Sequence, residues 1–443
     1  MSSSLSQTRE ASDSSVGEAQ RILEVGTYHV REVSEGRATR LRDGRLEIDT
    51  EDLKALATKE SPVADVGVSV ARPGDSIRLV NVLDAFQPAV KEGASDTTFS
   101  GVTGRLSPLG RGRTNCLDGV AVISTCDFRA THDVGQMLTP SRGYSTVDMD
   151  GPGRAFSHFA STVNVVLDFK CNSAFSFADC DRSIRRASLK IAQRLAEATS
   201  HEVSPPSVEE LTWGPVDKGL PAVCAIIQVD ADEPLCDTFF YGASLRGTLP
   251  FLSDPREILD GALNSGFYDF SGGSNPTYFY QRNSLLLSLL RAHGRDLRLA
   301  GVILAVVYWP SAFEKSRNAL LTAKLAENVG VQGAILTAFS IGNSHTDAML
   351  TCRACETLGI KTVVVISETN GGLTDYVEEA DAIVSVGNYE EIVDEWEPEE
   401  VIGGMYYDYE RSLPIARPGP LPLLAYFAST SQMGDMAMAV RSS

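Results

Sequence analysis

The chain has 443 residues, of which 43% are hydrophobic and 22% are charged, a composition typical of folded globular domains. A single hydrophobic core stops growing at roughly 250 to 300 residues, so this length predicts two or more domains. Asp and Glu outnumber Lys and Arg by 58 to 39, and an acidic surface repels nucleic acid and anionic lipid. We therefore exclude nucleic acid and membrane as partners.

The N-terminal segment and the cysteines bear on the location of the protein. Residues 1–20 are rich in Ser and have no apolar centre, which is typical of a disordered leader and not of a signal peptide. The longest apolar run, 301–309, is too short for a membrane helix, which needs roughly 18 to 20 residues. Eight cysteines are scattered along the chain without an export signal, so we expect reduced thiols and a cytoplasmic location.

The first part of the chain, residues 21–200, predicts a β-rich domain. Short apolar and β-branched runs bounded by Gly and Pro predict strands. They are 45–48, 66–70, 76–82, 119–125 and 163–169. Apolar residues at helical spacing predict one helix over 183–199.

The second part, residues 201–404, alternates strands with helices. The predicted strands are 222–229, 299–308, 332–337 and 361–366, and the predicted helices are 255–263, 284–293, 311–329 and 346–358. This alternation predicts a parallel sheet covered on both faces. We therefore predict an α/β fold class, with an N-terminal β-rich domain and a C-terminal doubly wound, Rossmann-like domain. Residues 405–443 form a tail that no pattern assigns to an element.

Three loops follow predicted strands at the carboxyl edge of the sheet, where open parallel sheets bind ligands. They are 308–316, 339–347 and 367–372. The middle loop ends a strand and opens a helix, so its main-chain amides and the helix dipole can bind a carboxylate. Its candidate substrate-binding residues are Gly342, Asn343, Ser344, Thr346 and Asp347. An ordinary capped helix start, with Asn343 or Ser344 as N-cap, is the alternative.

Two further residues at this edge are candidates. His345 is the one histidine near the middle loop, and an imidazole can act as acid or base near neutral pH. A solvent-facing, inert residue in the first helical turn is the alternative. Glu368 lies in the polar loop that follows the next strand, which is either part of a substrate site or a plain turn.

Cys352 and Cys355 form a C-x-x-C motif, which is a candidate dithiol or half of a metal site. The motif falls inside a predicted helix, and no second cysteine pair is near it in the sequence. We therefore expect structural thiols. The sequence also contains no H-E-x-x-H, no Walker loop and no G-x-G-x-x-G after a strand, so it predicts neither a metal site nor a nucleotide cofactor.

A succession of short motifs resembles the proprotein subunit of component B of the glycine, sarcosine and betaine reductases. In the N-terminal half the motifs are 71–78, 84–88, 110–114 and 149–153. In the C-terminal half they are 237–242, 260–263, 275–278 and 342–347. Each motif is weak by itself, but their order and approximate spacing hold from about residue 22 to residue 404. Asn275 joins the candidate substrate-binding residues through this resemblance.

The resemblance implies a specific chemistry. In that family the precursor cuts itself before an internal cysteine, which becomes a pyruvoyl group whose ketone condenses with an amine substrate. A thiol- or selenol-bearing partner subunit then displaces nitrogen from the substrate. Here Tyr268 stands at the position of that cysteine, and no cysteine occurs between Cys236 and Cys352. A tyrosine cannot undergo the acyl shift and β-elimination, so we expect no pyruvoyl cofactor.

Ser271 and Ser274 carry the β-hydroxyl that a serine-derived pyruvoyl group needs, so self-processing at either is an alternative to a plain flexible loop. We expect the non-thiol, substrate-binding subunit of a reductase-like hetero-oligomer, unprocessed and acting on a small amino- or carboxylate-bearing substrate by reductive C–N cleavage. One rival is a non-catalytic binding or regulatory module that retains the fold. Another is an independent enzyme that uses Tyr268, Asp269 and His345.

Overall fold

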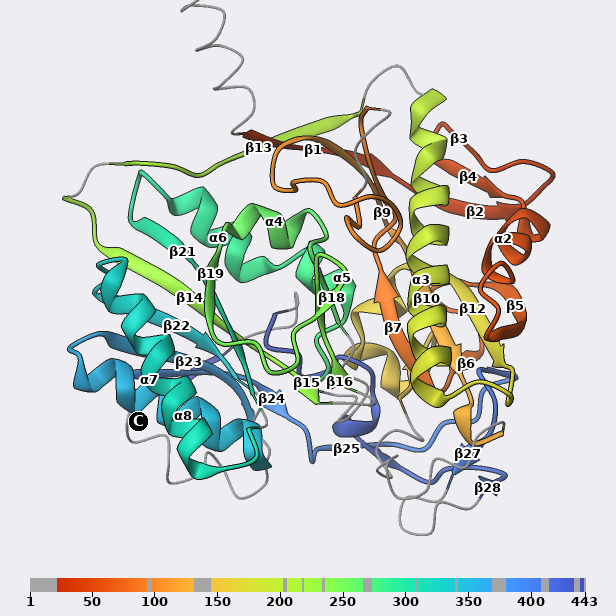
Figure 1. Cartoon of the computed structure of the whole chain (residues 1–443). Coiled ribbons are helices and arrows are strands. Elements are labelled where there is room, and N and C mark those ends of the chain that lie inside the picture. The colour runs from red at the N-terminus through yellow and green to blue at the C-terminus, as the bar shows by residue number, and fades with distance from the viewer. Residues whose placement is uncertain are drawn as a thin grey trace, which may run out of the picture.

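The chain folds into a mixed α/β structure with many strands and few helices, as the computed structural model in Figure 1 shows. The structure describes residues 22–93, 98–130, 145–201, 205–216, 219–232, 236–265, 273–307, 309–338, 342–368, 380–407, 414–433 and 439–441. The predicted α/β class is confirmed. The finer division into two domains, with the boundaries given above, stays a prediction.

Two four-stranded sheets and one long helix make up most of the N-terminal half (Figure 1). The first sheet has the order β13–β1–β9–β8, with β1 (Ile22–His29), β8 (Ala89–Lys91), β9 (Gly112–Asp118) and β13 (Ser207–Thr212). The second has the order β5–β12–β10–β7, with β5 (Val63–Ala71), β7 (Val82–Phe86), β10 (Val120–Cys126) and β12 (Val163–Cys171).

Helix α3 (Phe177–Ala196) packs its apolar face on this half. Ile184, Leu189 and Leu195 recur at helical spacing and are buried in the core, as the sequence periodicity predicts. The helix begins earlier than predicted because the Ser176 side chain accepts a hydrogen bond from the Asp179 amide and serves as its N-cap.

Smaller elements border these sheets. A three-stranded sheet contains β2 (Glu32–Glu35), β4 (Arg45–Ile48) and β3 (Arg40–Arg42), followed by α2 (Thr50–Ala57). Another contains β11 (Val147–Asp148), β6 (Ile77–Leu79) and β26 (Glu400–Ile402). Because β26 comes from near the end of the chain, its pairing with β6 returns the C-terminal segment to the N-terminal half. The 3-10 helices here are Phe128–Ala130, Pro152–Phe156, His158–Ser161 and Glu197–His201.

A seven-stranded sheet forms the centre of the C-terminal half. Its strands, in spatial order, are β19 (Phe251–Ser253), β21 (Arg298–Val306), β14 (Ala222–Val229), β22 (Gly333–Thr337), β23 (Lys361–Glu368), β24 (Ala382–Asn388) and β30 (Ala439–Arg441). The five inner strands are parallel, and the two edge strands are antiparallel to their neighbours. The chain proceeds in opposite directions across the sheet from β14, so a switch point lies between β14 and β22.

Helices lie on both faces of this sheet. Helices α7 (Ala312–Asn328) and α8 (Gly342–Thr357) run side by side over one face (Figure 1), where Ile226 of β14 joins their core cluster. Ile227, the next residue, points to the opposite face, into a cluster with residues of α4 (Pro255–Leu259), α5 (Thr277–Gln281) and α6 (Ser284–Ala292). That second cluster also includes Val166 of β12, so one hydrophobic core connects the two halves.

The remaining elements are short. They are β15 (Ala231–Asp232), β16 (Cys236–Asp237), β17 (Phe239–Phe240), β18 (Ala243–Ser244), β20 (Leu263–Asn264), β25 (Ile392–Val393), β27 (Tyr406–Tyr407), β28 (Pro414–Ile415), β29 (Leu421–Pro422) and the 3-10 helix Leu423–Ala425. Helix α4 ends sooner than predicted because Gly261 adopts a φ of +90°, which ends a helix readily. None of the described helices combines the length and the apolarity that crossing a membrane requires.

Candidate functional site

The predicted loop after β22 leads into the start of α8, where the side chains are mostly buried. Gly342 and Asn343 are the first two residues of α8. Ser344 and His345 are buried, whereas Thr346 is exposed. The solvent-facing alternative for His345 is therefore wrong, and its burial lowers the pKa of the imidazole.

Asp347 links α8 to the preceding helix. Its carboxylate forms an ion pair with Lys315 of α7, with 2.9 Å between Oδ2 and Nζ, and both side chains are buried. Glu368, the last residue of β23, is also buried, and its carbonyl oxygen accepts a hydrogen bond from the Tyr389 amide. These candidates all lie at the carboxyl edge of the parallel strands. Whether they bind a substrate stays a prediction.

Tyr268, Asp269 and Ser271 lie outside the described residues. The two ends of their segment, Ser265 and Gly273, are described, and buried polar side chains surround both ends. This polar cluster comprises Asp84, Arg185, Asp230, Ser274, Asn275, Thr277, Tyr280, Ser431 and Gln432. It connects residues from both halves of the chain.

Asp84 of β7 holds the first end of the segment through Thr277. The Thr277 amide donates to Asp84 Oδ1 at 2.8 Å and its hydroxyl donates to Oδ2 at 2.6 Å. The Thr277 hydroxyl in turn accepts a hydrogen bond from the Ser265 amide at 3.0 Å. Asp84 and Thr277 belong to two of the motifs that resemble the reductase family, 84–88 and 275–278. These two motifs thus meet beside the segment that contains Tyr268.

Asp84 is fully buried, and this burial raises the pKa of its carboxyl group to about 7, although hydrogen bonds from Thr277 act in the opposite direction. A carboxyl group with a pKa near 7 can accept or donate a proton at neutral pH. Asp84 is therefore the described group best suited to proton transfer in this cluster.

Arg185 of α3 reaches the same end of the segment from the N-terminal half. Its guanidinium donates a hydrogen bond to the Ser265 carbonyl oxygen, and it donates another to Asp181 at 3.1 Å. The guanidinium also lies 4.8 Å from the centre of the Phe239 ring. These contacts fix a positive charge beside the segment.

The other end of the segment is held by the C-terminal tail, which no sequence pattern placed. The Ser431 hydroxyl donates to the Asn275 side-chain oxygen at 2.6 Å, and the Asn275 amide nitrogen donates to Gln432 at 3.1 Å. Ser274 is buried, and its hydroxyl has no hydrogen-bond partner among the described residues. The candidate Asn275 therefore belongs to the polar cluster, next to one candidate processing residue.

Tyr280 shows that the polar cluster lies close to the end of strand β14 in the parallel sheet. Burial raises the pKa of its phenol, and the nearby carboxylates Asp230 and Asp84 raise it further, while a hydrogen bond with Asn275 opposes them. Asp230 directly follows β14, at the switch point of the strand order. In open parallel sheets this crevice is where ligands bind.

A second buried network of polar side chains positions the part of the chain that leads into this segment. Asp260, which follows α4, forms an ion pair with Lys91 of β8 and accepts hydrogen bonds from the Gly110 amide at 2.7 Å and the Thr114 hydroxyl at 2.6 Å. Lys91 also donates to the Arg111 carbonyl oxygen at 2.6 Å. Motifs 110–114 and 260–263 are thus in direct contact, and they position the chain just before Ser265.

Sequence reasoning missed Asp84, Arg185, Asp230, Thr277, Tyr280, Ser431 and Gln432. Asp84 and Thr277 were within the motifs that carry the resemblance, so a signal for them existed. Arg185 sits in an amphipathic helix and Ser431 in an unassigned tail, where no local pattern distinguishes them.

The C-x-x-C motif lies apart from the cluster. Cys352 and Cys355 are fully buried in the core between α8 and the sheet, inside a helix as predicted. Burial raises the pKa of the Cys355 thiol to about 12, which disfavours the reactive thiolate. Within the described part of the chain, no group of three or more His, Cys, Asp or Glu side chains is arranged to hold a metal ion.

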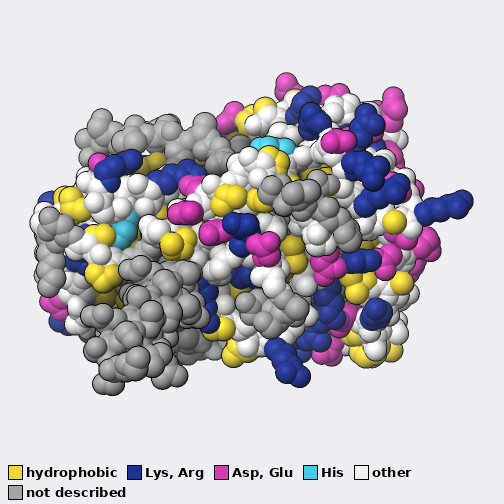
Figure 2. Space-filling view, turned by 90° about the horizontal axis from the view of Figure 1, so that it is seen from above, with side chains coloured by type: hydrophobic (Ala, Val, Ile, Leu, Met, Phe, Trp, Pro, Cys, Tyr) yellow, Lys and Arg dark blue, Asp and Glu magenta, His cyan; other side chains and the backbone are white. Residues whose placement is uncertain are grey.

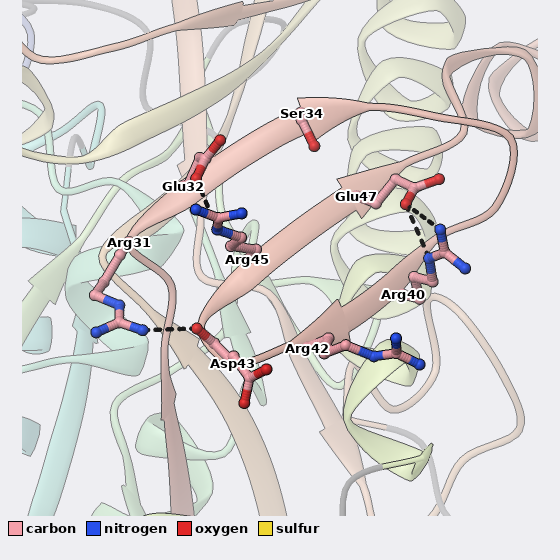
Figure 3. A pocket seen from close by; sticks show the side chains of 8 residues that line it. All are labelled: Arg31, Glu32, Ser34, Arg40, Arg42, Asp43, Arg45 and Glu47. Atoms are coloured by element: carbon pink, nitrogen blue, oxygen red, sulfur yellow. Dashed lines mark hydrogen bonds and ion pairs between the residues drawn. The ribbon is translucent and has the colours of Figure 1, made fainter.

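A charged depression of about 550 Å³ lies on the small sheet β2–β4–β3 (Figure 3). Ion pairs within it join Arg40 to Glu47 and Arg45 to Glu32. The sheet is at the edge of the molecule, away from β14 and α5 (Figure 1). Lys and Arg side chains also lie among Asp and Glu on the surface that Figure 2 shows. We assign no function to this depression.

Comparison with known proteins identifies one family. The family model described as glycine/sarcosine/betaine reductase component B subunits matches residues 22–412. Subunits alpha and beta of glycine reductase component B from Acetoanaerobium sticklandii are 30% identical over 380 residues, which is 83% of this chain and 85% of the relative. The alpha subunits of component B of the sarcosine and betaine reductase complexes of Peptoclostridium acidaminophilum are 30% and 29% identical, over 82% and 84% of this chain and 85% of each relative. No solved structure matches significantly.

Proposed function

The chain belongs to the family of glycine, sarcosine and betaine reductase component B subunits, and we propose that it is the non-thiol, substrate-binding subunit of a reductase-like hetero-oligomer. A thiol- or selenol-bearing partner subunit then performs the reductive cleavage of a C–N bond in a small amino- or carboxylate-bearing substrate, in the cytoplasm. The family match over residues 22–412 is the observation that carries this proposal. Tyr268, at the position where the resemblance expects the processing cysteine, supports an unprocessed chain.

The cysteines of the chain support a division of labour between two subunits. The seven cysteines whose side chains are described are all buried. Burial raises the pKa of Cys116, Cys224 and Cys355 to about 12, and only the thiolate is a good nucleophile. Cys171, whose pKa is lowered, ends strand β12, which the proposed substrate site does not use. A thiol that attacks a substrate is therefore better supplied by a second chain.

We also propose that the chain stays unprocessed and carries no pyruvoyl group. Residues 237–351 contain no cysteine. Tyr268 has an aromatic ring where the acyl shift needs a thiol or a hydroxyl on the β-carbon. The residues present therefore do not fit a cysteine-derived pyruvoyl group, and the proposed reaction uses no ketone.

One observation favours a serine-derived group as the second candidate. The Ser274 hydroxyl is buried and lacks a hydrogen-bond partner among the described residues, so it is available to attack the preceding carbonyl carbon. Self-processing at Ser274, or at Ser271 outside the described residues, would then cut the chain. The mass of the purified chain separates the two candidates.

We place the substrate between the polar cluster and the start of α8. The pKa of about 7 supports Asp84 as the group that transfers a proton. Gly342, Asn343, Ser344, Thr346, Asp347 and Glu368 remain the candidates for carboxylate binding, and Tyr268, Asp269 and His345 remain candidates for acid–base chemistry. The parallel centre of the seven-stranded sheet supports a doubly wound C-terminal domain around this site.

Co-purification of this chain with a thiol- or selenol-bearing reductase subunit tests the proposal. We expect a stable complex that cleaves a small amine only when both chains are present, with Cys352→Ala/Cys355→Ala retaining activity within a few-fold. A catalytically competent lone chain supports the independent enzyme instead. A complex that forms but has no activity toward amines supports the non-catalytic module.

A further inference from the structure

A pair of thiols lies in the N-terminal half, on strands that the proposed substrate site does not use. Cys126 is the last residue of β10, and Cys171 is the last residue of β12, its parallel neighbour in the sheet. The two Sγ atoms are 3.8 Å apart and both residues are buried. The C-x-x-C motif, by contrast, is in the other half of the chain.

The chain that follows Cys171 is partly exposed. Cys171 itself is only 5% exposed, Asn172 is half-buried, and Ser173 and Ala174 are exposed. The pairing of β12 with β5 shifts its register between Lys170 and Cys171, so the backbone leaves the regular ladder at this residue. Cys126, by contrast, is followed by half-buried Asp127 and then by buried Phe128.

We propose that Cys126 and Cys171 form an oxidisable dithiol, which a hydroperoxide converts into a disulfide. The Sγ atoms must approach from 3.8 Å to the bond length of about 2.05 Å. Cys126 lies opposite Phe169, two residues before Cys171, so the ends of both strands must move to close this distance.

The hydrogen bond between the thiols distinguishes their roles. The Cys126 thiol lowers the pKa of Cys171, and the same hydrogen bond raises the pKa of Cys126. Cys171 is therefore the thiolate that reacts first, and Cys126 supplies the second thiol.

The reaction balances with hydrogen peroxide as the oxidant. The Cys171 thiolate attacks one peroxide oxygen and the O–O bond breaks, which gives a sulfenic acid and a hydroxide that takes up a proton to become water. The Cys126 sulfur then displaces the sulfenic oxygen, which leaves as a second water. The S–S bond forms, the two thiols lose two electrons, and the peroxide is reduced to water.

Cys180 of α3 is a third thiol close to this pair. It is fully buried, and a hydrogen bond with it also lowers the pKa of Cys171. Burial raises the pKa of Cys180 itself to about 12, and the pKa of Cys126 is raised as well, so ionisation does not select between these two thiols. The experiment therefore has to identify which sulfur Cys171 joins.

The test treats the full-length chain with hydrogen peroxide near neutral pH, alkylates the remaining thiols after unfolding, and maps the peptides by mass spectrometry without reduction. We expect two of the eight cysteines to escape alkylation, in a linked peptide pair that contains Cys126 and Cys171. Full alkylation of all eight overturns the proposal. So does a link from Cys171 to Cys180, or oxidation of Cys171 beyond the sulfenic acid without a link.

Two variants that each replace one cysteine test which sulfur atoms form the link. In Cys126→Ser we expect no linked pair and accumulation of a sulfenic acid at Cys171, which a carbon nucleophile such as dimedone traps. In Cys116→Ser, which removes a buried thiol elsewhere, the linked pair should form as in the unmodified chain. A link that persists in Cys126→Ser, or that disappears in Cys116→Ser, would contradict the assignment.

Discussion

At the scale of single residues, we propose that Tyr268 prevents processing at the cleavage position of the family. The acyl shift and β-elimination that form a pyruvoyl group need a small nucleophile on the β-carbon, which a tyrosine lacks. We expect one species near 47.7 kDa in intact mass spectrometry of the purified chain, and the same result for Ser274→Ala. Two fragments that meet between residues 267 and 274 in the unmodified chain, and disappear in Ser274→Ala, would instead show serine-dependent processing.

Asp84 should make stability depend on pH. Its folded pKa of about 7 is above the ordinary value of 3.8 for an aspartate side chain, so the folded chain binds this proton more tightly than the unfolded chain. The resulting stability is fully present below about pH 4 and is lost as the pH rises through 7. The expected loss is on the order of 1 to 4 kcal/mol.

Asp84→Asn removes this titration, so we expect its melting temperature to fall less between pH 5 and pH 8 than that of the unmodified chain. The proteins are compared by the slope of melting temperature against pH, because the substitution by Asn also weakens the contacts with Thr277. Asp65→Asn, at a side chain that is 65% exposed, is the matched control and should keep the original slope. Equal slopes in all three proteins would show that Asp84 stays ionised.

Helices α7 and α8 are joined by one buried ion pair, Lys315 to Asp347. Removing one partner leaves a buried charge without compensation, which costs about 3 to 5 kcal/mol, whereas replacing both by apolar residues is often neutral. We therefore expect Lys315→Met to lower the free energy of unfolding by this amount and Lys315→Met/Asp347→Leu to recover most of it.

The same two variants show whether Asp347 acts on the substrate. If it only connects the helices, substrate affinity should be recovered together with stability in the double variant. If Asp347 binds substrate, the double variant should be stable but still weak in binding. Thermal unfolding and titration with substrate, performed on the same preparations, distinguish the two outcomes.

At the scale of the whole molecule, the C-terminal segment contacts the N-terminal half at Arg78 and along strand β6. Arg78 forms a buried ion pair with Asp148, at 2.5 Å between Nε and Oδ1, and its guanidinium lies 5.4 Å from the centre of the Trp396 ring. Strand β26 pairs with β6 at the same place. Trp396 and β26 come earlier in the chain than Ser431 and Gln432, which belong to the polar cluster. We call the contacts of Arg78 and β6 with this part of the chain the anchor.

We expect Arg78→Met to lower the free energy of unfolding by about 3 to 5 kcal/mol, because Asp148 then remains buried and unpaired. The variant should also expose the tail to limited proteolysis and weaken substrate binding. Arg40→Met is the control, since it breaks an ion pair whose arginine is 58% exposed and should cost under about 1 kcal/mol. Similar losses in both variants would show that the anchor adds nothing beyond a surface pair.

Local patterns in the sequence were sufficient for the longer helices α3, α6, α7 and α8 and for the strands β14, β21, β22 and β23. The apolar run at 222–229 is strand β14, and the periodic segment after Ser311 is helix α7, with Ser311 as its N-cap. Hydrophobic periodicity and capping act between residues close in sequence, so they can be read without a structure. The motif succession likewise identified the family, whereas the departure from it at Tyr268 stays a prediction.

Only the tertiary structure brought the polar cluster together. Asp84 and Thr277 are 193 residues apart, and Asn275 and Ser431 are 156 residues apart. Their side chains meet because the core connects the two halves and because the tail returns along β6. The pKa of Asp84 is likewise a consequence of burial that the packing of distant segments produces. Contacts over such separations follow from the global packing, which no local pattern of residues encodes.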